Sequence, residues 1–95
     1  MEVLILVPGA VTAGTKISFP SYAPPASKLA YVAVVSLVEG TPNTFSLSAK
    51  TITTGTPSSG EAALSGTDGI VLGDDVTASD LVIVVYVKKG EYSGA

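Results

Sequence analysis

The chain has 95 residues, 46% of them hydrophobic and 14% charged, with a formal net charge of −3. A chain of this length builds one domain around one core, which excludes a catalytic domain joined to a separate regulatory domain. Histidine, cysteine and arginine are absent, so Ser-His-Asp and Cys-His catalysis, thiolate metal sites and arginine-based nucleic-acid recognition are excluded within one chain.

The first half of the chain predicts three strands. Residues 2–7 form a strand that is apolar from Val3 onward and ends at a Pro-Gly pair, which is a turn signal. Residues 11–19 alternate apolar and polar side chains, as a strand with one buried face does. Three prolines in residues 20–27 predict extended surface backbone, because proline cannot donate a hydrogen bond to a sheet. Residues 29–38 then form a long strand with apolar side chains on both faces.

The second half predicts four more strands. Residues 44–50 alternate as a half-exposed outer strand does, and residues 51–54 continue it past a bend. We expect a short strand, rather than a helical turn, at residues 61–64. An Asp-Gly turn introduces the strand at 70–72, and residues 81–87 form the last strand.

No stretch has a helical period, and about seven strands are separated by turn signals roughly every ten residues. This pattern predicts an all-β fold. We expect a single antiparallel β-sandwich, Ig-like or jelly-roll-like, in which residues 1–95 form one domain.

The last strand has no polar side chain on either face, whereas a half-exposed strand alternates. Each of Val82, Val84 and Tyr86 contributes about 1.5–3 kcal/mol when it is removed from water. A second apolar face left in water would also promote edge-to-edge aggregation. We therefore expect a neighbouring subunit, in preference to a second layer of the same chain, to cover this face and the second face of residues 29–38.

The predicted interface combines these apolar faces with tyrosines and prolines of the loop and tail. A tyrosine joins a broad apolar ring to a polar tip and is a frequent interface anchor, although packing inside the sandwich explains Tyr86 equally well. The predicted interface residues are Tyr22, Pro24, Pro25, Val32, Val34, Val82, Val84, Tyr86 and Tyr92.

Few residues could take part in catalysis or bind a metal ion. A serine-lysine pair is conceivable, but no lysine is predicted in an apolar pocket, so we expect lysines that solubilise strand ends. Asp68, Asp74, Asp75 and Asp80 are the only acidic concentration, and oxygen ligands of this kind suit calcium. Their spacing matches no EF-hand, and aspartate is common in turns. We therefore predict turn residues, with calcium binding as the alternative, and no enzyme activity, catalytic residue or cofactor.

The sequence also favours some locations over others. The acidic start at Met1-Glu2 and the short apolar run at 3–7 do not fit a secretion signal, whose apolar region has about 7–15 residues. No stretch approaches the roughly 20 apolar residues of a membrane helix. We expect synthesis in the cytoplasm without a signal peptide, and neither a membrane nor a nucleic acid as partner.

A short chain without cysteine or histidine, rich in Val, Thr, Ser and Gly, with a proline-rich loop at 20–27 and an apolar last strand at 81–87, is a recognisable type. It resembles the small β-sandwich structural proteins of tailed phages, above all capsid decoration (cement) proteins, with tail or fibre components next. The resemblance carries over no functional residue. It implies a virion protein that forms a homo-oligomer, often a trimer, and docks on the major capsid protein or another virion protein to reinforce the shell.

The alternative from a different class is a stand-alone binding module, either carbohydrate-binding or adhesin-like. The missing tryptophan and the missing signal peptide argue against it. A binding module should be monomeric and stabilised by its ligand, whereas a shell protein should be oligomeric and found with capsid or tail protein.

Overall fold

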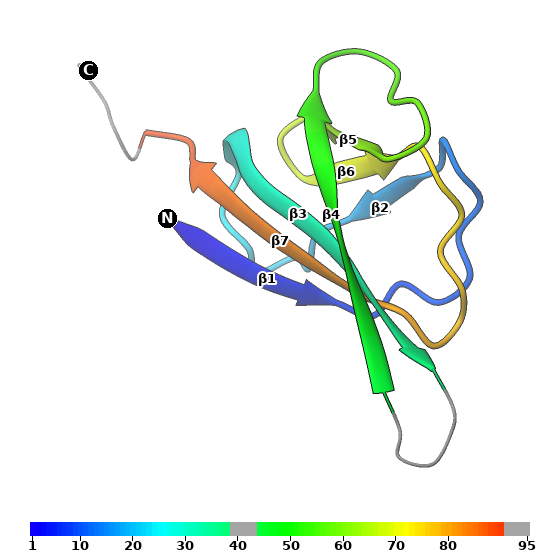
Figure 1. Ribbon diagram of the computed structural model, residues 1–95. Coiled ribbons are helices and arrows are strands. Elements are labelled where there is room, and N and C mark those ends of the chain that lie inside the picture. Colours follow the sequence, from blue (N-terminus) through cyan, green and yellow to red (C-terminus); the bar gives the residue numbers. More distant parts are fainter. Residues whose placement is uncertain (39–43, 91–95) are drawn as a thin grey trace.

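The computed structural model describes residues 1–38 and 44–90. Within these ranges the protein is all-β, as predicted, with seven strands and no helix (Figure 1). The strands are β1 (Glu2–Leu6), β2 (Lys16–Ser18), β3 (Ala26–Val38), β4 (Thr44–Thr53), β5 (Glu61–Ser65), β6 (Gly69–Leu72) and β7 (Leu81–Lys88). The described part of the chain thus contains no helix that is long and apolar enough to cross a membrane.

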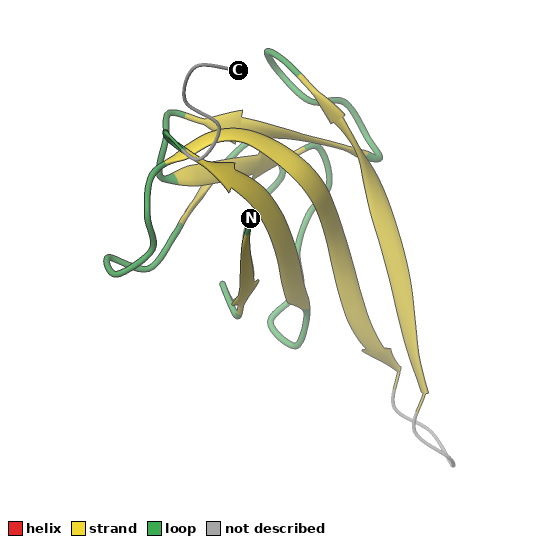
Figure 2. Ribbon diagram, turned by 90° about the vertical axis from the view of Figure 1, so that its left-hand side faces the viewer, coloured by secondary structure: helices red, strands yellow, loops and turns green. Residues whose placement is uncertain are grey.

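The seven strands form one mixed sheet in the order β1-β7-β3-β4-β5-β6-β2. The sheet curls around its own core into a half-barrel, which Figure 2 shows from the side. The predicted all-β fold of about seven strands is confirmed, but the strands form one mixed, curled sheet and not a clear antiparallel β-sandwich. The residues of β4 from Thr44 to Lys50 pair with β3 and its last three residues pair with β5, so one strand carries the sheet around the bend.

The β4–β5 pair is parallel, and it is the one parallel pair among the described strands. Parallel neighbours usually need a long crossover connection. Here only three residue pairs overlap, from Thr51 opposite Glu61 to Thr53 opposite Ala63, so a short loop is enough to return the chain.

The predicted strand at 11–19 is reduced to the three residues of β2 and an isolated bridge. Val11 exchanges two backbone hydrogen bonds with Val76, at 2.9 and 2.8 Å. Gly14 has a φ of +87°, which a strand does not allow, and Thr15 donates back to Thr12 in a turn. The glycine therefore interrupts a segment whose alternation is otherwise that of a strand.

The core fills the inner side of the half-barrel. It includes Tyr86, whose ring stacks on Phe19 with the centroids 5.1 Å apart and whose hydroxyl donates to the Pro24 carbonyl at 2.7 Å. Burial raises the pKa of this phenol. The proline-rich loop before β3 is thus tied to β7, next to the edge strand β1, and it packs against the core.

Five of the predicted interface residues lie in this core, each at most 7% exposed: Val32, Val34, Val82, Val84 and Tyr86. Their assignment to a subunit contact is corrected accordingly. The sheet curls toward them, so that other strands of the same chain, with Ile17 and Ile70 among them, supply the cover. The second apolar face of β7 and β3 is the odd-numbered one.

Candidate interaction surface

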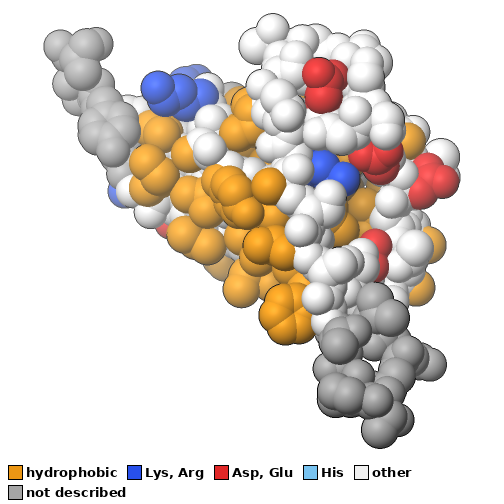
Figure 3. Space-filling model, viewed as in Figure 1, with side chains coloured by type: hydrophobic (Ala, Val, Ile, Leu, Met, Phe, Trp, Pro, Cys, Tyr) orange, Lys and Arg blue, Asp and Glu red, His pale blue; other side chains and the backbone are white. Residues whose placement is uncertain are grey.

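The outer side of β1, β7, β3 and β4 carries an apolar surface. The registers place Ile5 opposite Ile83, Ile83 opposite Ala33 and Ala33 opposite Ala49, so one row of side chains crosses four strands. We call the whole set the outer face: Val3, Ile5, Tyr31, Ala33, Val35, Phe45, Leu47, Ala49, Leu81, Ile83 and Val85. Figure 3 looks onto it and shows the hydrophobic side chains gathered there.

Much of the outer face is in contact with solvent. Val3, Ile5, Phe45 and Leu47 are 61%, 65%, 68% and 56% exposed. None of the residues of the outer face is charged. These four residues lie on β1 and β4, the outermost strands of this face, with the apolar side chains of β7 and β3 between them, so the apolar surface is continuous, whereas apolar residues on an ordinary surface are scattered singly. A continuous, uncharged apolar patch indicates an interaction site.

β4 shows most clearly that the outer face is not part of the protein's own core. Its alternation was predicted correctly, but Phe45 and Leu47 point to the outside of the half-barrel. Ser46 and Ser48 point to the inner side, where they are also exposed. The apolar face of this amphipathic strand is therefore presented to solvent.

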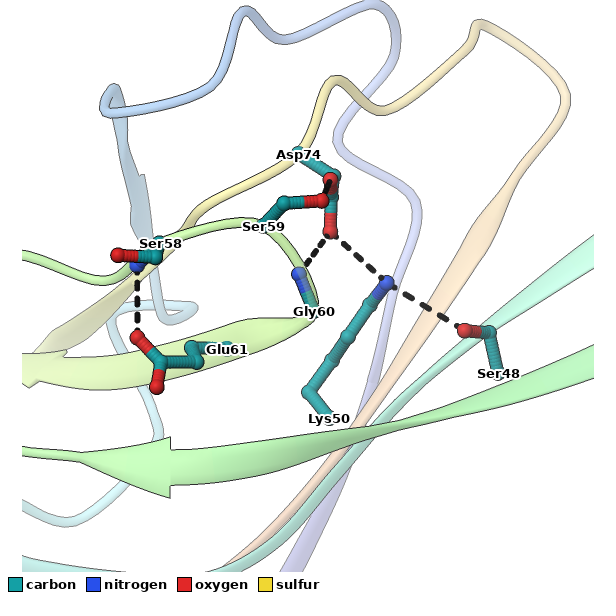
Figure 4. Close-up of polar contacts among 7 residues, drawn as sticks. All are labelled: Ser48, Lys50, Ser58, Ser59, Gly60, Glu61 and Asp74. Atoms are coloured by element: carbon teal, nitrogen blue, oxygen red, sulfur yellow. Dashed lines mark hydrogen bonds and ion pairs between the residues drawn. The ribbon is translucent and has the colours of Figure 1, made fainter.

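A polar cluster behind β4 holds the loop at residues 54–60 (Figure 4). The Asp74 carboxylate accepts hydrogen bonds from the Ser59 hydroxyl at 2.6 Å and the Gly60 amide at 2.7 Å, and it forms an ion pair with Lys50 at 3.3 Å. These contacts, the Ser59 hydrogen bond first, lower the pKa of Asp74 to about 2. Glu61 accepts a further hydrogen bond from the Ser58 amide at 2.8 Å.

Lys50 differs from the expected solubilising lysine. Its side chain is 10% exposed, and its ammonium contacts both Asp74 and the Ser48 hydroxyl, the latter at 3.4 Å. Both contacts hold the Lys50 side chain between β4 and the turn that follows β6. The cluster is therefore a connection between β4 and its neighbouring loops.

The other three aspartates serve separate turns. Asp68 pairs with Lys16, whose hydrogen bond lowers the pKa of that carboxyl. Asp75 accepts from the Ala13 amide at 2.8 Å, and Asp80 accepts from the Thr77 amide at 3.0 Å.

Asp80 is buried, which opposes its ionisation, but hydrogen bonds from Thr77 and Ser36 outweigh the burial and lower its pKa. Within residues 1–38 and 44–90 no three carboxylates gather into a group that could hold a metal ion. Each of the four carboxylates instead has its own hydrogen-bond or ion-pair partners among the described residues.

Three of the four remaining predicted interface residues lie away from the outer face. Tyr22 is 83% exposed and Pro25 is also exposed, in the loop between β2 and β3, while Pro24 is half-buried beneath Tyr86. Tyr92 lies outside the described residues. The outer face itself was missed, because alternation shows that a strand has two unlike faces without showing which of them the fold covers.

Comparison of the chain with protein-family models, with curated proteins and with solved structures finds no match.

Proposed function

We propose that the protein is a non-catalytic structural subunit that acts by assembly through its outer face. The chain resembles in type the capsid decoration (cement) proteins of tailed phages. On that basis we propose a virion protein that oligomerises and reinforces the shell. The observation that supports this proposal most strongly is the exposed, uncharged outer face that spans β1, β7, β3 and β4.

The energy available from this surface supports the proposal. Covering a valine, leucine, isoleucine or phenylalanine side chain contributes about 1.5–3 kcal/mol. The outer face offers several such side chains, and four of them, Val3, Ile5, Phe45 and Leu47, are more than half exposed. Its lack of charged residues matches the composition of an interface core, where such residues are depleted.

The surface fits a carbohydrate-binding or adhesin-like module less well. Sugar recognition needs polar groups that fix the hydroxyls beside an aromatic platform. On the outer face, Tyr31 alone carries a polar side-chain atom, and Phe45 is the one other aromatic residue. A broad, nearly all-aliphatic strand surface suits another protein surface better than a sugar.

The proposal is tested by co-sedimentation with assembled shells from the source of the chain, with the variants Leu47→Lys and Ser46→Lys. The two residues are adjacent on β4, both exposed, and on opposite faces. We expect Leu47→Lys to weaken shell binding at least tenfold, because it places a charge in a desolvated contact, and Ser46→Lys to bind as the wild type does.

Equal binding by both variants, or a wild-type protein that binds no assembled particle, would contradict the proposal. Binding to isolated tails in place of shells would move the protein to the tail or fibre and leave the role of the outer face intact.

A further inference from the structure

The sheet has two edges, β1 and β2, and only one of them is protected. Natural proteins protect a free edge by making it short, by placing charges or proline on it, or by introducing a bulge. β2 has three residues, one of which is Lys16 in its ion pair with Asp68. β1 has five residues in a regular register with β7, without lysine, proline or bulge, and its one charged residue is Glu2 at its first position.

Within residues 1–38 and 44–90, no strand pairs with the second side of β1. Its paired side faces β7, and the other side of an edge strand presents amide and carbonyl groups outward. In the described ranges, none of the backbone hydrogen bonds outside the strand ladders involves residues 2–6. Val3, Ile5 and Val7, the side chains at this edge, are 61%, 65% and 70% exposed.

We propose that β1 pairs with β1 of a second copy of this chain, antiparallel and about a two-fold axis through Leu4. The two half-barrels would then share one continuous sheet. The inference rests on the proposed function, because it names the contact through which the proposed oligomer forms. This contact is the edge of β1, whereas the shell is proposed to bind the outer face.

The sequence of β1 is complementary to itself in this register. All five residues are paired, Leu4 faces Leu4 of the second copy, and Val3 faces Ile5 of the second copy on the outer side. The two Glu2 carboxylates lie at opposite ends of the pair, so that no like charges face each other. A shift by one residue would place outer side chains opposite core side chains, which the pleat disfavours.

The register can be tested with two double variants that carry charges at the same positions. In Val3→Lys/Ile5→Lys, introduced ammonium groups face each other across the two-fold axis, and we expect the dimer dissociation constant to rise at least tenfold. In Val3→Glu/Ile5→Lys, the carboxylate at position 3 faces the ammonium at position 5 of the second copy, and we expect the dimer to persist.

The readout is analytical ultracentrifugation of the isolated full chain over a range of concentrations, with circular dichroism to confirm folding. Leu47→Lys is the matched control, because it places a lysine on the outer face away from the edge, and it should dimerise as the wild type does. A dimer lost through Leu47→Lys, with shell docking also lost, would assign both contacts to the outer face and overturn the edge pairing.

Cross-linking gives a second measurement that does not depend on charge. The chain has no cysteine, so a mixture of Val3→Cys and Ile5→Cys chains should form a disulfide-linked pair under mild oxidation, and neither variant should do so alone. A wild type that stays monomeric at every concentration, equal behaviour of the two charged variants, or cross-linking of either cysteine variant by itself would overturn the proposal. Dimerisation without shell binding would remove the proposed function and leave the edge pairing standing.

Discussion

Asp74 connects three parts of the fold through one carboxylate. It receives hydrogen bonds from the loop at 54–60 and an ion pair from Lys50 of β4, and it sits in the turn that follows β6. Its short side chain is also that of an ordinary turn residue, which is the role that the sequence predicts. Its connection with Lys50 could not be predicted, because the two residues come together only where the sheet bends.

The Asp74 carboxyl should make stability depend on pH at the acid end. Its pKa is about 2 in the folded protein, below the ordinary 3.8, so the unfolded chain binds the proton more tightly. The stabilisation is fully present above about pH 4 and is lost as the pH falls through about 2. We expect urea midpoints to fall less between pH 5 and pH 2 in Asp74→Asn than in the wild type, with Asp75→Asn as the control. Parallel curves for Asp74→Asn and the wild type would contradict this.

At the scale of the element, the positions of the strands along the chain could be predicted from the sequence. The pairing of the strands, and the face of each strand that meets the core, could not. Alternation and turn signals place β1, β3, β4 and β7 within a few residues, because they are local properties. The β4–β5 pairing depends on three residue pairs across a loop, so the half-barrel could not be told from a sandwich. For the same reason, the even-numbered face of β7 was expected to contact a neighbouring subunit, whereas it packs in the core of its own chain.

Neighbouring residues of β7 should therefore respond in opposite ways to a charge. Val84 is fully buried, whereas Ile83 belongs to the outer face. We expect Val84→Lys to prevent folding, because a buried unpaired charge costs several kcal/mol, and Ile83→Lys to fold normally and to lose shell binding. Circular dichroism and thermal melts check this. A folded Val84→Lys with an unfolded Ile83→Lys would reverse the assignment of faces.

At the scale of the whole molecule, the core and the exposed apolar surface lie on opposite sides of one curled sheet. The inner side of the curled sheet holds the core, and the proline-rich loop, tied to Tyr86, packs against it. The outer side keeps an apolar surface in solvent, and β1 adds an unprotected edge. The sequence predicts more apolar strand surface than one core needs, and the structure locates the surplus on the odd-numbered face of β7 and β3.

The most direct measurement of the central claim is oxidative footprinting of the free and the shell-bound protein. Phe45 on the outer face and Tyr22 in the loop before β3 are both exposed aromatic residues, at 68% and 83%. We expect shell binding to suppress oxidation of Phe45 and Leu47 and to leave Tyr22 unchanged. Unchanged oxidation of Phe45 and Leu47, with or without protection of Tyr22, would contradict docking through the outer face.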